Sequence, residues 1–196
     1  MIYIALSIIG FIGKSFLFKQ LLAIYNKSQL HQLMCALFCL LISGALFELS
    51  LYYFADNIDS PLANKCLIGF YFCLFYIAGL LPLIALATSN TQIPHWLLYT
   101  FLSVIGAVTV LLLFSRSIIA DIEFVASTAS ITRVAGPYYF IFQTVVVLCL
   151  LSTLLILIKR SFASNYFVRV RSRNLCIAFI PVFSFSVFIV AAMAMG

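Results

Sequence analysis

The sequence predicts an all-α protein, a polytopic transmembrane helix bundle of about six spans that forms a single domain over residues 1–196. Three observations lead to this fold class. Hydrophobic residues make up 65% of the chain and charged residues only 8%, whereas soluble domains are about half apolar and about a quarter charged. The apolar residues form continuous runs of about 20, the length that crosses a bilayer as a helix. These runs lack the polar–apolar alternation of a transmembrane β-barrel.

The six predicted spans alternate with polar connections. They cover residues 2–25, 33–54, 66–87, 96–114, 138–158 and 175–195. In the first, Lys14 lies about 18 Å along the helix axis from Ile2, near the bilayer centre, so a five-span arrangement with an interfacial first segment stays an alternative. The third and sixth contain Pro82 and Pro181, which transmembrane helices tolerate because neighbouring groups satisfy the freed carbonyls.

The connection between the fourth and fifth spans is the longest, running from Ser115 to Gly136. Its segment Arg116–Phe124 mixes charged with apolar residues, a composition that suits a short helix lying on the membrane surface. Such a helix could roof a ligand pocket, or the connection could be a flexible tether. Pro137 then precedes the fifth span, close to the first helical turn, where a missing N–H costs nothing.

Orientation follows from the basic residues, because Lys and Arg concentrate in cytoplasmic loops. One side of the predicted bundle carries Lys14, Lys19, Lys27, Lys159, Arg160, Arg169, Arg171 and Arg173. The other carries Lys65, Arg116 and Arg133, together with all five acidic residues. We therefore expect a bacterial inner (plasma) membrane protein with both termini outside.

Ionisable residues inside a membrane cost about 2.5 to 3.5 kcal/mol each on insertion scales, so they are the first candidates for function. Lys14 and Glu48 are the two inside predicted spans. They could form a stabilising pair or reach separately to water, or they could line a polar pocket or proton site. The candidates for a ligand site or polar pocket are Lys14, Glu48, Asp121, Glu123 and Arg133.

The connection after the fifth span, residues 159–173, holds five cations and no acid: Lys159, Arg160, Arg169, Arg171 and Arg173. This run sets topology and attracts anionic lipid at the inner face. It could also dock a cytoplasmic protein partner. Direct nucleic-acid binding is not expected, because the run is short and held against the membrane at both ends.

Catalysis is not expected of this chain. It carries no phosphate-binding loop, zinc motif, nucleophile elbow or dinucleotide fingerprint. Cys35 and Cys39 share a helix face, but their span contains no His, and its carboxylate, Glu48, is nine residues beyond Cys39, so no metal site is completed. We therefore predict a protein that is not an enzyme and has no metal and no cofactor.

Residues 120–190 resemble the multi-span N-terminal sensor region of bacterial histidine kinases of the quorum-sensing type. The likeness rests on the segment Val134-Ala135-Gly136-Pro137-Tyr138, the span after it, the arginines at 169, 171 and 173, and a further span from Asn174-Leu175. Those regions typically have seven spans followed by a kinase. With six spans and no phosphotransfer helix here, the resemblance implies signal perception without kinase activity.

The leading functional hypothesis is a non-enzymatic sensor or receptor-like subunit that couples an outer stimulus or a membrane state to a cytoplasmic protein. One alternative is a small transporter or channel, in which Lys14 and Glu48 line a path. Another is the membrane subunit of a multi-protein system such as antiphage defence. The sequence leaves open whether the chain forms a homo-oligomer.

Overall fold

The computed structural model describes residues 2–24, 28–54, 61–88, 95–114, 116–125 and 130–195. These residues form six helices and one two-stranded antiparallel hairpin. In chain order the elements are α1 (Ile2–Ala23), α2 (Gln29–Tyr53), α3 (Pro61–Ala87), α4 (His95–Phe114), β1 (Ile119–Val125), β2 (Ser130–Ala135), α5 (Tyr139–Arg160) and α6 (Tyr166–Met195).

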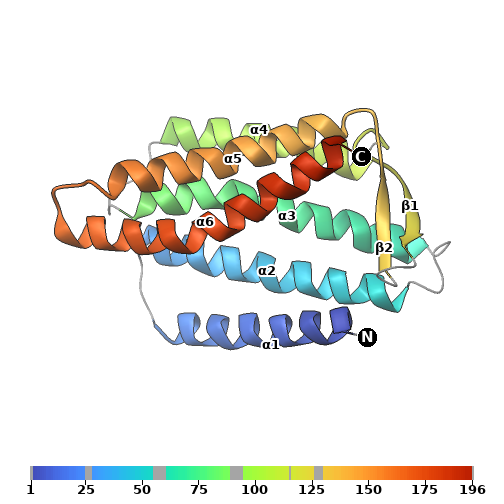
Figure 1. Ribbon diagram of the computed structural model, residues 1–196, viewed down its shortest axis with the longest axis horizontal. Coiled ribbons are helices and arrows are strands. Elements are labelled where there is room, and N and C mark those ends of the chain that lie inside the picture. The colour runs from blue at the N-terminus through green and yellow to red at the C-terminus, as the bar shows by residue number, and fades with distance from the viewer. Residues whose placement is uncertain are drawn as a thin grey trace.

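The helices run alternately in opposite directions, so both chain ends lie at the same end of the bundle as the β1–β2 hairpin (Figure 1). We call this the hairpin end. The opposite end contains the end of α5, the turn 161–165 and the first turns of α6, and we call it the basic end. The six described helices therefore place the two chain ends at one end of the bundle, and that this end faces outward stays a prediction.

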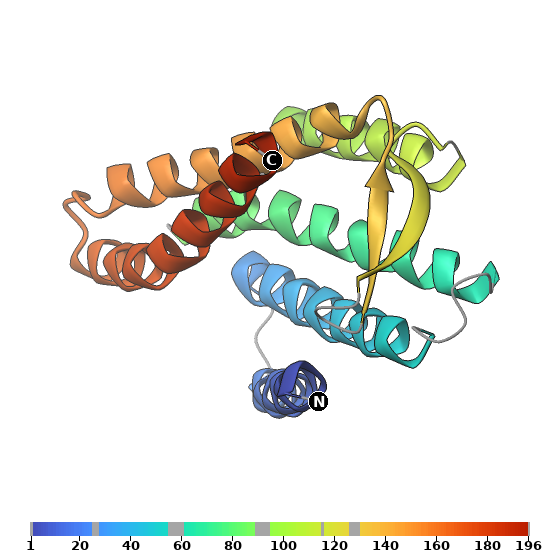
Figure 2. The same ribbon diagram turned by 45° about the vertical axis from the view of Figure 1, so that its right-hand side comes forward.

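Helix α3 is the central element. It packs against α2 on one side and α5 on another, and it also contacts α4, whereas α1 packs mainly on α2 and α6 mainly on α5 (Figure 2). Of its most apolar 18-residue window, 44% is buried, compared with 0% in α1. Small residues such as Ala63, Ala78 and Ala85 let the neighbouring helices approach α3 closely.

Two hydrophobic clusters hold the bundle together. The larger one, toward the hairpin end, joins α2, α3, α4, α5 and the entry to the hairpin; its members include Leu51, Leu67, Phe75, Leu112, Ile118, Ile119 and Phe142. The smaller one joins α3, α5 and α6 through Ala85, Leu150, Leu157 and Phe179.

The prediction of a multi-pass membrane protein is confirmed. Helices α1, α2, α3 and α5 are each long and apolar enough to cross a bilayer. The first predicted span is among them, and the alternative of an interfacial first segment stays open. The spans predicted at residues 96–114 and 175–195 fall in α4 and α6, and their crossing of the membrane stays a prediction.

The surface helix expected at Arg116–Phe124 is wrong, because residues 119–125 form β1 and pair with β2. The segment is rich in Ile and Val, which favour a pleated strand over a helix. Its acidic residues Asp121 and Glu123 are spaced by two, so both lie on one exposed face of the strand, and the half-buried Ile122 between them lies on the other. Ile119 is buried although it is two residues before Asp121, because the strand register shifts between these two residues. From Asp121 onward the charged and apolar residues therefore alternate with the period of a strand.

The basic connection expected over residues 159–173 is mostly helical. Helix α5 continues to Arg160 and α6 begins at Tyr166, so only residues 161–165 form a turn. The side chain of Asn165 accepts hydrogen bonds from the N–H groups of Phe167 (3.0 Å) and Val168 (3.4 Å). This N-cap starts α6 ahead of the apolar stretch, so Arg169, Arg171 and Arg173 lie on a helix.

Candidate functional site

Arg133 joins the hairpin to the helix bundle. It lies on β2, and its guanidinium carbon is 4.3 Å from the ring centre of Tyr139 on α5 and 5.5 Å from that of Tyr71 on α3. Cations above aromatic rings at such distances are stabilised by about 0.5 to 2 kcal/mol, and more strongly when shielded from water. One arginine therefore connects three separate elements.

The rings beneath Arg133 continue into the core. Phe142 lies 5.9 Å from Tyr71 and 5.8 Å from Tyr139, and Phe75 stacks on Phe142 at 5.3 Å between ring centres. We call Arg133, Tyr71, Tyr139, Phe142 and Phe75 the arginine–tyrosine cluster. Phe75 of α3 and Phe142 of α5 belong to the larger hydrophobic cluster. Arg133 therefore lies on rings that are continuous with the contact between α3 and α5.

The hairpin is also fixed by its base. The N–H of Gly136 donates to the Ile118 carbonyl and that of Tyr138 to the Ser117 carbonyl, both at 2.8 Å. A Cβ on Gly136 would collide with the Ser117 carbonyl group, so glycine is required where the two chain segments cross. Ile118 and Ile119 are buried in the larger hydrophobic cluster directly beside this crossing.

The fold does not place Asp121 and Glu123 next to Arg133. On β1 the residue opposite Arg133 is Ile122, while Asp121 faces Val134 and Glu123 faces Thr132. Since successive side chains of a strand point to opposite faces, the two acids lie on the face away from Arg133. Both are exposed, so they form an acidic outer surface of the hairpin rather than part of the arginine–tyrosine cluster.

The two predicted intramembrane charges, Lys14 and Glu48, lie at the α1–α2 contact. Glu48 accepts a hydrogen bond of 3.0 Å from the Ser7 hydroxyl. Lys14 is two helical turns farther along α1, about 10 Å from Ser7 along the axis. Both charged residues are half-buried. Within the described residues, the hydrogen-bond partner of Glu48 is therefore Ser7, and Lys14 lies apart from this bond.

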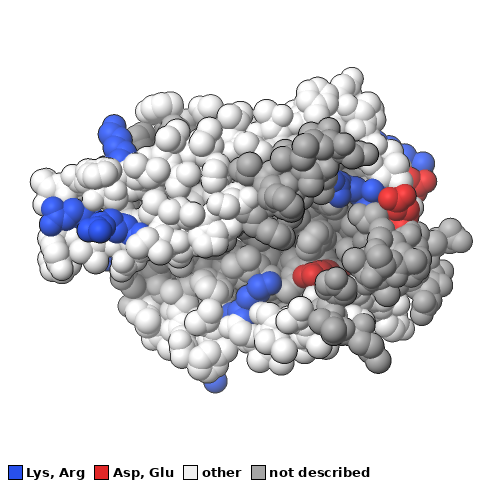
Figure 3. Space-filling view, viewed as in Figure 1, with Lys and Arg blue, Asp and Glu red and all other residues white. Residues whose placement is uncertain are grey.

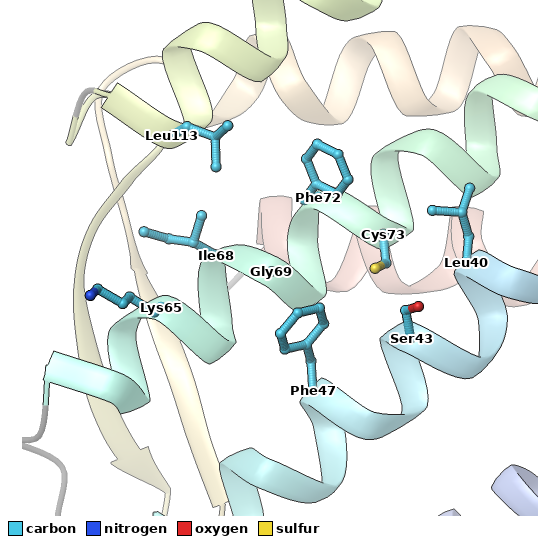
Figure 4. A pocket seen from close by; sticks show the side chains of 9 residues that line it. All are labelled: Leu40, Ser43, Phe47, Lys65, Ile68, Gly69, Phe72, Cys73 and Leu113. Atoms are coloured by element: carbon cyan, nitrogen blue, oxygen red, sulfur yellow. The ribbon is translucent and has the colours of Figure 1, made fainter.

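An apolar pocket of about 550 Å³ lies between α2, α3 and α4 (Figure 4). Its lining residues are Leu40, Ser43, Phe47, Lys65, Ile68, Gly69, Phe72, Cys73 and Leu113. Lys65 is the one cation among them. Most of these side chains are half-buried or exposed, so the pocket opens on the surface of the bundle.

The basic end carries the other predicted contact residues. Arg171 and Arg173 are exposed on α6, and the guanidinium carbon of Arg169 is 5.7 Å from the Tyr166 ring centre. Lys159 and Arg160 close α5, the first exposed and the second half-buried. On the face shown in Figure 3, Lys and Arg lie at this end without Asp or Glu, whereas basic and acidic residues both occur at the centre and at the hairpin end.

Sequence reasoning singled out Arg133 but missed Tyr71 and Tyr139 as its partners. Tyr139 stands at the start of a span, a position typical of an interfacial tyrosine, and Tyr71 is one aromatic residue among many in a continuous apolar run. The pocket was also missed, because no spacing links α2, α3 and α4. Among the described residues, no three His, Cys, Asp or Glu side chains gather as metal ligands would.

Comparison with protein-family models, curated proteins and solved structures found no match for this chain. The resemblance of residues 120–190 to kinase sensor regions therefore stays a prediction from sequence.

Proposed function

We propose that this protein is a non-enzymatic membrane sensor subunit, in which the hairpin end receives a stimulus and the basic end passes it to a cytoplasmic protein. The observation that carries the proposal is the position of Arg133. This side chain rests on Tyr71 of α3 and Tyr139 of α5, so any stimulus that moves the hairpin changes the contacts of two transmembrane helices at once.

Helix α5 offers a route from one end to the other. Tyr139 is its first residue, and Leu150 and Leu157 lie farther along in the cluster that includes Phe179 of α6. A helix is a stiff rod, and packed elements of this kind can carry coupling between distant sites. A tilt or rotation of α5 at the hairpin end would therefore change how α6 packs at the basic end.

The arginines of α6 suit an output surface. Arg171 and Arg173 are exposed and lie beyond the first turn of α6, which begins at Tyr166. The helix dipole acts within that first turn, so it does not account for these two cations. Their charges are free to attract an acidic partner protein or anionic lipid at this surface.

Coupling between the two ends can be tested without knowing the stimulus. Hydrogen exchange would be measured on the full chain in lipid nanodiscs for wild type, Arg133→Gln and Arg116→Gln. Arg116 is an exposed cation just before the hairpin, so its replacement removes the same charge without touching the arginine–tyrosine cluster. We expect Arg133→Gln to raise exchange in the hairpin and also in residues 161–173 at least several-fold, with little change in Arg116→Gln.

Faster exchange confined to the hairpin would refute coupling between the ends. The transporter alternative makes a separate prediction, solute flux in proteoliposomes that falls when Lys14 or Glu48 is neutralised. Flux of that kind, together with unchanged exchange at the basic end, would replace the sensor proposal.

A further inference from the structure

The pocket between α2, α3 and α4 has the form of a lipid site. Its volume of about 550 Å³ lies within the range of about 300 to 1,000 Å³ usual for ligand sites. Phe47, Ile68, Phe72 and Leu113 give it apolar walls. In Figure 4 these side chains surround the space from three helices, with Lys65 at one end and Ser43 and Cys73 toward the other.

The pocket is short enough to fit within one leaflet. Lys65 is in the second turn of α3, near the hairpin end, where headgroups would lie. Cys73 is eight residues farther along the same helix, a distance of about 12 Å. The hydrocarbon core of a bilayer is about 30 Å thick, so a pocket that begins at headgroup depth would end just short of the midplane. The headgroup-proximal part of one acyl chain, with its headgroup beside Lys65, matches this length and polarity.

Gly69 determines the depth of the pocket floor. A Cβ at this position would lie 2.7 Å from the Phe47 ring, so the glycine allows the tip of the ring to approach the α3 backbone. Any larger residue would force Phe47 to shift and so change the wall of the pocket.

The surrounding bilayer determines which molecule is expected to occupy the pocket. Lipid tails are as apolar as the pocket walls, so burial alone does not favour one apolar ligand over another. Bilayer phospholipids also surround the opening at far higher concentration than any other amphiphile. Selectivity must then come from Lys65, since a cation near a membrane surface strengthens the binding of anionic lipid about fivefold.

We propose that this pocket binds one acyl chain of an anionic phospholipid from the hairpin-end leaflet, with the phosphate group beside Lys65. This proposal names lipid composition as the membrane state that the protein senses. That role of the bound lipid as a stimulus rests on the proposed sensor function. Lipid binding itself is measured independently of any coupling to the basic end.

Photo-crosslinking tests the site. The full chain would be reconstituted in liposomes that contain either phosphatidylglycerol or phosphatidylcholine with a diazirine in one acyl chain, and adducts would be mapped by mass spectrometry. We expect phosphatidylglycerol to label peptides containing Phe47, Phe72 or Leu113 about fivefold more than phosphatidylcholine does. Lys65→Gln should remove this preference, while Lys19→Gln, an exposed lysine on α1, should leave it intact.

A second variant tests the cavity itself. Ser43→Leu adds bulk to the pocket wall and should reduce labelling of these peptides by both lipids. Equal labelling by the two lipids in wild type, or adducts spread evenly over all lipid-facing helices, would overturn the proposal. Displacement of the label by a free fatty acid but not by unlabelled phosphatidylglycerol would also overturn it, in favour of a single-chain amphiphile. Loss of coupling in the hydrogen-exchange experiment with lipid selectivity preserved would reject the sensor function alone.

Discussion

The two ends of the bundle use arginine in opposite ways. At the hairpin end Arg133 is drawn onto the rings of Tyr71 and Tyr139, above a hydrophobic cluster that includes the entry to the hairpin. At the basic end Arg171 and Arg173 stand exposed on the first turns of α6. The difference shows that the same type of side chain packs into the fold at one end and forms an exposed charged surface at the other.

The largest loss of folding stability is expected from Gly136→Ala at the base of the hairpin. The added methyl group meets the Ser117 carbonyl, so the crossing must open, at a cost of about 2 to 3 kcal/mol. Thermal unfolding in mild detergent would measure it. Gly106→Ala is the matched control, since nothing lies within 4 Å of its Cβ position. Equal melting temperatures for the two variants would show that the hairpin does not stabilise its end of the bundle.

A smaller loss is expected from Arg133→Gln, which removes the cation above two rings at a cost of about 1 to 2 kcal/mol. Arg133→Lys keeps the charge and should recover part of this stability. A double-mutant cycle with Tyr139→Leu would isolate the contact between the two side chains. Additive effects in that cycle would mean that Arg133 stabilises the hairpin by some other contact, and the contrast between the two ends would lose its basis.

A still smaller loss of folding stability is expected when the α1–α2 contact is weakened. Ser7→Ala removes the hydrogen bond to Glu48, and such bonds between membrane helices average about 0.6 kcal/mol. Ser103→Ala is the control, because Ser103 bonds to the Tyr99 carbonyl within its own helix. Glu48→Gln should leave yield nearly unchanged, since the amide still accepts the bond from Ser7. A large loss of folded protein, with the activity of each remaining folded molecule unchanged, would show that Glu48 is structural.

The smallest effect on folding is expected at the basic end. Replacing Arg169, Arg171 and Arg173 together by Gln should change stability by less than about 0.5 kcal/mol, with a cytoplasm-only reporter near Asn165 still active. Attachment to anionic liposomes should weaken by up to about 3 kcal/mol. Recovery of a cytoplasmic partner should also fall, and the remaining association should depend less on salt. Unchanged recovery would count against coupling through this surface.

The sequence by itself determined the membrane-spanning class and the approximate position of each helix. Apolar runs of about 20 residues and their polar connections are local features, and a helix satisfies its own backbone hydrogen bonds wherever it stands. The excess of Lys and Arg in the connections on one predicted side can also be read directly from the sequence. The beginning of α6 at Tyr166 was missed because the Asn165 cap extends the helix through a polar stretch that looked like a loop.

Only the tertiary structure decided which residues of different helices and strands contact one another. The segment Arg116–Phe124 was misread as a surface helix, because its mixed composition was considered without its alternation, and the pairing of β1 with β2 is what selects the strand. The rings beneath Arg133 come from α3 and α5, and the pocket walls come from α2, α3 and α4. Such contacts depend on how helices pack in three dimensions. The spacing of residues along the sequence does not show which helices will pack against one another.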